Sequence, residues 1–249
     1  MTERLESRDG RSVLHMERRL KHPPEKVWRA ITEPARLAEW FPAAMTPQLR
    51  KGGAVDFGFG DPGTVTDLDP PRLFAFTWGD DHLRWELHPD GGEGTLLVLV
   101  HTFADRAGAA SFAAGWHTCI AALDLALDGR AGADPGVDDV ALHERYVAEF
   151  GLDAGTAETT PDGWRVRFER QLTRPADVVW AALTADAAPG SVRDGHVLER
   201  DGGRVRWELR EGTGHGARLV HTRTGVDGDP DAALDVGGTE IDALLARLR

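Results

Sequence analysis

Apolar and polar residues alternate over several short stretches in the first half of the chain. The alternation predicts strands at residues 13–20, 54–59, 64–68, 73–78, 83–88 and 95–102. Turn sequences such as GDPG and PDGGEG separate these stretches, which is typical of an antiparallel meander. Because successive side chains of a strand point to opposite faces, one face of the predicted sheet is rich in aromatic residues: Phe57, Phe59, Phe74, Phe76, Trp78 and Trp85.

The apolar period changes to that of a helix between residues 106 and 127. Residues at helical spacing there are Phe112, Trp116, Cys119, Ile120, Leu123 and Leu127. We expect this long amphipathic helix to pack against the aromatic face of the sheet. Shorter helices are predicted at residues 25–32, behind Pro23-Pro24, and at 139–150. The strand at 95–102 is apolar on both faces, so something is expected to cover its outer face, the second half of the chain being a candidate.

Part of this pattern occurs twice. The stretch 17–32 (ERRLKHPPEKVWRAIT) aligns without a gap with 169–184 (ERQLTRPADVVWAALT), and RWEL recurs at 84–87 and 206–209. VHT recurs at 100–102 and 220–222. The order is kept, so we predict a duplication. The expected organisation is a full-length domain at 1–150, a linker at 151–163 and a shortened copy at 164–249.

The second copy is shorter between its anchors. The first copy has 51 residues at 33–83 and the second 21 at 185–205, a difference of 51 − 21 = 30. The missing residues correspond to LAEWF, AVDFGF and much of LFAFTW, so we expect no roomy pocket there. Its predicted elements are strands at 164–172, 195–200, 204–210 and 217–222 and a helix at 240–248. This copy is expected to pack on the first domain or to mediate homodimer formation.

Composition excludes several classes of function. A formal charge of −12 and a pI near 5.3 oppose binding to nucleic acid and to anionic membranes. The single cysteine, Cys119, cannot form an intrachain disulfide, and no metal-binding motif occurs among the scattered histidines. The N-terminus has no apolar signal segment, and the longest aliphatic run, Leu96 to Val100, is too short to span a bilayer. We expect a cytoplasmic bacterial protein without membrane insertion.

The order of several motifs resembles a known superfamily. These motifs are PPEKVW, LAEWF, DLDPPRLFAFTW, VHTF and GWHTCIAALDLAL, within residues 23–127. Together they resemble the SRPBCC (START-like) superfamily, and most of all its branch named for homology to the activator of Hsp90 ATPase. The resemblance implies an α+β helix-grip fold, in which a curved antiparallel sheet wraps around a long C-terminal helix, here with a shortened second copy. Members include lipid carriers, hormone receptors, polyketide aromatases and cyclases, and self-resistance proteins.

The superfamily's cavity between sheet and helix directs attention to a set of aromatic and polar residues. We predict ligand contacts from Trp40, Phe57, Phe59, Phe76, Trp78, Trp85, His101 and Trp116. The alternative is that these side chains fill a closed core. His101 and His221 are equivalent in the VHT match, which favours a structural role for both. Trp28 and Trp180, also equivalent, are expected to serve packing, and His117 and Cys119 are not expected to form a nucleophilic pair.

The leading hypothesis is a non-enzymatic protein that binds a hydrophobic or aromatic small molecule in the N-terminal cavity, without a cofactor or metal. One alternative is a cyclase, dehydratase or hydrolase acting on a polyketide-like substrate, in which His101 carries protons. The other is a chaperone-associated interaction module, suggested only by the name of the family branch.

Overall fold

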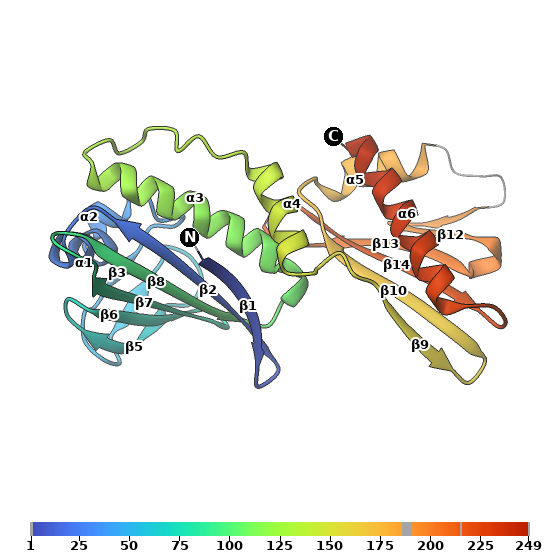
Figure 1. The fold of residues 1–249 in the computed structure, drawn as a ribbon, viewed down its shortest axis with the longest axis horizontal. Helices are drawn as coiled ribbons and strands as arrows, with labels where there is room; N and C mark the ends of the chain where they lie inside the picture. Colours follow the sequence, from blue (N-terminus) through green and yellow to red (C-terminus); the bar gives the residue numbers. More distant parts are fainter. Residues whose placement is uncertain (1, 186–190, 215, 249) are drawn as a thin grey trace. The chain divides into compact units, whose positions relative to one another are not determined.

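The computed structural model describes residues 2–185, 191–214 and 216–248. The chain forms two compact units. Unit 1 comprises Met1–Ala109 and Ala113–Leu142, and unit 2 comprises Ala110–Phe112 and His143–Arg249. Each unit has its own antiparallel sheet and its own long helix (Figure 1).

The sheet of unit 1 has eight strands in the order β1-β2-β8-β7-β6-β5-β4-β3. Their bounds are β1 Thr2–Arg8, β2 Arg11–Leu20, β3 Thr46–Pro47, β4 Ala54–Asp56, β5 Gly63–Asp69, β6 Leu73–Trp78, β7 Asp81–Pro89 and β8 Thr95–Phe103. Two short helices, α1 (Pro24–Thr32) and α2 (Pro34–Leu37), interrupt the chain between β2 and β3. The turn η1 (Arg106–Gly108) then leads into the long helix α3 (Ala109–Leu127).

Helix α3 runs along one face of this sheet (Figure 1). Its buried side chains recur at helical spacing, at Ala113, Trp116, Ile120, Leu123 and Leu127. The segment Arg106–Leu127 is long and apolar enough by length and composition to cross a membrane, a test that core helices also pass. Here the apolar stripe of α3 belongs to the core of unit 1. This arrangement confirms the α+β helix-grip architecture.

Unit 2 repeats the design with fewer strands. Its sheet has the order β11-β12-β13-β14-β10-β9, all antiparallel. The strands are β9 Thr156–Thr160, β10 Gly163–Gln171, β11 Val192–Asp194, β12 Val197–Arg200, β13 Val205–Glu211 and β14 Ala217–Gly225. The helices are α4 (Asp139–Glu149, whose first residues belong to unit 1), α5 (Ala176–Thr184) and α6 (Pro230–Leu248), and η2 (Asp201–Gly203) is a short turn.

The two sheets share one strand order. Read from the same edge, β9, β10, β14, β13 and β12 take the places of β1, β2, β8, β7 and β6. Even individual backbone bonds recur, since Leu87 N donates to Arg72 O at 2.8 Å and Leu209 N donates to His196 O at 3.0 Å. Such agreement is what a duplication is expected to leave behind.

The strand registers correct one detail of the predicted repeat. In unit 1, Leu99 lies opposite both Trp85 and Met16. In unit 2, the position opposite Trp207 and Phe168 is held by His221. The β7–β8 and β13–β14 hairpins therefore align without a gap, and His221 takes the place of Leu99. The equivalence of His101 with His221 was wrong, because the two VHT triplets are out of register by two residues.

Arg223 is the residue that takes the place of His101. It lies opposite Val166 and Val205, as His101 lies opposite Leu14 and Leu83. The aromatic strand LFAFTW was predicted to be largely missing from the second copy, but β12 pairs with β13 as β6 pairs with β7. The shortening falls mainly before that strand, where unit 1 has 40 residues at 33–72 and unit 2 has 12 at 185–196.

Candidate functional site

Eight aromatic rings contact one another between the inner face of the first sheet and α3. We call them the aromatic cluster: Trp40, Phe41, Phe57, Phe74, Phe76, Trp78, Trp85 and Trp116. Ring centroids of contacting pairs lie 4.7 to 6.1 Å apart, in both stacked and edge-to-face geometries. Such pairs contribute about 0.5–1.5 kcal/mol beyond the area that they bury.

The predicted site residues are brought together with one exception. Trp40, Phe57, Phe76, Trp85 and Trp116 are all buried within the cluster, and Trp78 is half-buried at its margin. His101 is buried beside Trp116, with ring centroids 6.0 Å apart. Phe59 is 62% exposed and touches only the margin of the cluster, 6.5 Å from the ring of Trp78. Sequence reasoning missed Phe41, which contacts Trp40, Trp78 and Trp116.

Phe59 lies outside because the alternation of β4 stops before it. The strand ends at Asp56, and the backbone of Gly58 and Gly60 then adopts positive φ angles of 76° and 65°. Asp56 Oδ1 accepts a hydrogen bond from Gly58 N at 2.8 Å, which closes the turn. A positive φ suits glycine and reverses the chain, so the period of two no longer determines the side chain's face.

His101 connects the cluster to the first residue of β7 through two hydrogen bonds. Trp116 Nε1 donates to His101 Nδ1 at 3.1 Å, and His101 Nε2 lies 3.0 Å from Asp81 Oδ2. An indole N–H can only donate, so Nδ1 must be without a proton, and Nε2 then carries the proton that is donated to the carboxylate. The partners therefore select one neutral tautomer of His101.

This tautomer bears on the enzymatic alternative. A general base needs a nitrogen lone pair within hydrogen-bonding reach of the substrate. The lone pair of His101 is directed at Trp116, and its N–H is directed at Asp81. His101 can exchange a proton with a bound molecule only after one of these bonds breaks, so its geometry favours a structural role at the wall of the cluster.

A surface cavity of about 310 Å³ reaches the cluster at Trp40. Its apolar lining residues, which we call its floor, are Ala30, Trp40, Ala126 and Leu127, and we call its charged lining residues its rim. Trp40 is held in place because its Nε1 donates to Ala30 O at 2.9 Å, and its ring lies edge-on to Trp85 at 5.6 Å. Trp40 thus has one side at the cavity and the other in the aromatic cluster.

The rim of this cavity is polar. It carries Lys26, Arg29, Glu33, Arg36 and Glu39. Lys26 Nζ donates to Leu127 O at 2.6 Å and so caps the C-terminal end of α3, where cations are favourable. Arg36 pairs with Glu39 at 3.5 Å. Small-molecule sites combine apolar surface with polar groups that orient the ligand, and this cavity has four apolar and five charged lining residues.

The other reactive side chains of unit 1 have structural partners. Burial, together with the nearby Asp139 carboxylate, raises the pKa of Cys119 to about 11, so its thiol is not activated. His117 Nδ1 lies 2.8 Å from Arg18 Nη2, which donates to it. Within the described residues no group of three His, Cys, Asp or Glu side chains could hold a metal ion.

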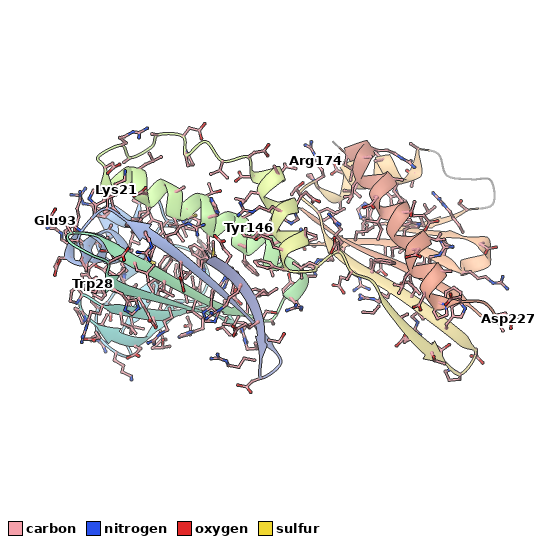
Figure 2. All side chains as sticks on the ribbon, viewed as in Figure 1. Lys21, Trp28, Glu93, Tyr146, Arg174 and Asp227 are labelled. Carbon is pink, nitrogen blue, oxygen red and sulfur yellow. The ribbon has the colours of Figure 1, made fainter. Side chains whose placement is uncertain are left out.

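The repeat-related tryptophans pack at the margins of their own units. Trp28, labelled in Figure 2, lies half-buried on α1 with its ring edge-on to Phe74 at 6.5 Å. Trp180 is half-buried on α5, and its ring lies 5.6 Å from that of His196. Neither ring lines the cavity at Trp40.

Residues 21–128 match the family model described as "Activator of Hsp90 ATPase homolog 1-like protein". A conserved protein of unknown function from Enterococcus faecalis, EF2215, superimposes with a TM-score of 0.53 at 20% identity, covering 59% of this chain and 89% of that one. CalU16 from Micromonospora echinospora gives 0.49 at 20% identity, covering 60% and 94%. No curated protein matches the chain.

The fold and the structural similarity define unit 1 as a helix-grip domain. The sequence similarity to the activator of Hsp90 ATPase homolog 1-like family covers residues 21–128, which is less than half of the chain. The family match does not reach residues 143–249 of unit 2, whose descent from the same domain stays a prediction.

Proposed function

We propose that unit 1 binds an aromatic small molecule, without catalysing its conversion, in the cavity that reaches the aromatic cluster at Trp40. The observation that carries the proposal is the double position of Trp40, which lines a cavity of about 310 Å³ and contacts Trp85 and Phe41 behind it. A volume of this size is at the lower end of the range for small-molecule sites.

The floor of the cavity favours an aromatic group. Ala30, Ala126 and Leu127 supply apolar surface beside the indole of Trp40, against which an aromatic ring can pack. The charged rim requires that a polar substituent of the ligand remain at the opening, because burying it among apolar groups would cost hydrogen bonds with water. The ligand is therefore a compact aromatic molecule with a polar end.

Binding without catalysis is supported by His101. Both of its ring nitrogens are engaged, and none of the described residues that line the cavity is a histidine, serine or cysteine. The charged side chains of the rim suit orientation of a ligand. In this proposal the physiological role is carriage or sequestration of the aromatic compound.

The test is a titration of the full chain with N-phenyl-1-naphthylamine, a neutral aromatic probe whose fluorescence rises in apolar surroundings. We expect saturable binding and a raised melting temperature. Ala126→Phe fills the cavity from α3 without altering a ring of the cluster, so it should weaken probe binding about tenfold or more. Trp40→Leu should have a similar effect, because it removes the stacking surface.

Trp28→Leu is the matched control, since it removes a half-buried tryptophan from the same unit outside the cavity. It should leave the affinity for the probe unchanged. Equal binding by wild type and Ala126→Phe would place the probe elsewhere and refute the proposed cavity. No saturable binding by the wild type would favour a filled core and an interaction role.

A further inference from the structure

A second pocket of unit 1, of about 290 Å³, lies on the face of the sheet opposite α3. It is lined by Arg8, Asp9, Arg11, Val13, His82, Arg84, Val100 and Thr102. The strand registers explain how these residues meet. Val13, Thr102 and His82 form one row across β2, β8 and β7, and Val100 pairs with Arg84 in the next row.

The β1–β2 hairpin brings two arginines to the edge of this pocket. Arg8 and Arg11 lie directly opposite each other in the register. Like charges in this position destabilise a hairpin unless an opposite charge compensates them. Arg11 has partial compensation, because its Nη2 donates to Asp80 O at 2.6 Å and lies 3.8 Å from Asp81 Oδ1. Arg8 forms no ion pair with a carboxylate within the part of the chain that the structure describes.

The third arginine, Arg84, is neutralised by carboxylates that do not line the pocket. Arg84 Nε donates to Glu86 Oε1 at 2.6 Å, and Arg84 Nη1 donates to Asp67 Oδ2 at 3.3 Å. Neither carboxylate lines the pocket, whose own formal charge is +2 from three arginines and Asp9. The cationic character of the pocket therefore rests on Arg8 and, in part, on Arg11.

The pKa of His82 reflects the burial and the positive charges around this pocket. Burial lowers the pKa of His82, and the charges of Arg84 and Arg11 lower it further. Its Nε2 lies 2.8 Å from Thr66 Oγ1. The imidazole is accordingly disposed to remain neutral, as expected where cations surround a titrating base.

We propose that this pocket binds the phosphate group of a small phosphorylated molecule. Guanidinium groups match the geometry of phosphate oxygens, and a phosphate monoester carries close to two negative charges at neutral pH, which Arg8 and Arg11 can meet. Arg8 and Arg11 hold the phosphate, and the hydroxyl of Thr102 supplies a further donor. An apolar portion of the ligand lies on Val13 and Val100.

The site is distinct from the cavity at Trp40, and no residue that the structure describes lines both. The proposal of a phosphate site is therefore independent of the proposed aromatic ligand. One connection exists, because Asp81 faces Arg11 on one side and His101 on the other. A phosphate that draws Arg11 away from Asp81 alters the hydrogen-bonded environment of Trp116 through His101.

The experiment is calorimetric titration of the full chain with phenyl phosphate at low ionic strength, where exposed charges are least screened. Saturable binding is expected, with affinity reduced about tenfold in Arg8→Gln and in Arg11→Gln, since each loses a charge-assisted hydrogen bond. Arg4→Gln is the control, because Arg4 is an exposed arginine of the same strand that pairs with Glu6 outside the pocket. It should bind as the wild type does.

Two further titrations test the chemistry of the ligand. Benzoate should bind more weakly than phenyl phosphate, and equal affinity would overturn the assignment of a phosphate group. Inorganic phosphate should also bind more weakly, and equal affinity would overturn the role of Val13 and Val100. Absence of saturable phenyl phosphate binding, or unchanged affinity in Arg8→Gln, would overturn the site itself.

Discussion

Single residues decide what the aromatic cluster can do, and His101 is the most informative of them. Its protonation state follows from the chemistry of its partners, one of which can only donate and the other only accept. The bonds join α3 to the first residue of β7 through β8. A sequence cannot supply this, since Asp81 and Trp116 are 35 positions apart (116 − 81) and neither belongs to a motif that pairs them.

His101→Leu should destabilise the protein by about 2–3 kcal/mol, because it leaves the buried Trp116 N–H and the half-buried Asp81 without their partner. Urea unfolding measures the loss. Asp81→Asn is the matched variant, in which the amide oxygen can still accept from Nε2, and it should cost less. Equal losses in the two variants would contradict the assigned tautomer.

A buried ion pair gives the second prediction at this scale. Arg18 and Glu3 lie on paired strands at 2.6 Å, with side chains only 7% and 8% exposed. Arg18→Met leaves the Glu3 carboxylate buried and uncompensated, and should cost about 3 kcal/mol or more. The double variant Glu3→Gln, Arg18→Met should recover part of that stability in the same unfolding measurement. A double variant no more stable than Arg18→Met would argue against an uncompensated charge.

At the scale of elements, periodicity predicted the interior strands and α3 well and the edges poorly. β1 (TERLESR) and β9 (TAETT) are edge strands with few apolar residues, so they carry no buried face for the alternation to reveal. The strand that contains RWEL, β7, pairs with β6 and β8 as the antiparallel meander predicts. Phe59 did not, since glycines with positive φ precede and follow it.

Helix α6 begins at Pro230, ten residues before the predicted start at Glu240. Gly237-Gly238 suggests a break in the helix, but Gly237 is required by packing. A Cβ at this position would lie 2.6 Å from Phe168 Cε2. The close approach of α6 to β10 therefore requires a glycine within the helix, at a position where the sequence pattern suggests that the helix is interrupted.

These neighbouring glycines provide a matched pair of variants. A Cβ at Gly238 would meet no atom of another element within 4 Å, so Gly238→Ala should stabilise unit 2 by about 0.5–1 kcal/mol through the lower helical cost of alanine. Gly237→Ala should destabilise it, since the contact with Phe168 outweighs that gain. Thermal unfolding followed by circular dichroism compares them, and a rise in melting temperature for Gly237→Ala would contradict the packing described.

At the scale of the whole molecule, acidity should be more damaging than alkalinity. Hydrogen bonding from His143, against burial, holds the pKa of Glu144 below its usual value, with the Arg170 charge assisting. Burial would raise the pKa of Glu240, but hydrogen bonds from His221 and Arg223 outweigh it and keep the pKa low. Both carboxylates belong to unit 2.

A carboxylate whose folded pKa is depressed binds protons more readily when unfolded. Its contribution to stability is therefore complete above about pH 5 and is lost as the pH falls through the folded pKa. We expect the melting temperature to fall between about pH 5 and pH 3. Glu240→Gln should lower stability at pH 7 and flatten this acid dependence, and an unchanged slope would show that Glu240 is not among the groups responsible.

The gapless alignment of the β7–β8 and β13–β14 hairpins has a consequence for comparing the two halves of the chain. If two strands are aligned with an error of two residues, each side chain still falls on the same face of the sheet, so the hydropathy pattern does not reveal the error. Here the identical VHT triplets favour that wrong alignment. The partners differ accordingly, because His221 faces Glu240 and a backbone carbonyl, whereas His101 faces an indole N–H and a carboxylate. The two VHT triplets are thus identical in sequence but do not occupy equivalent positions in the two sheets. The residue to mutate alongside His101 in the other half is therefore Arg223.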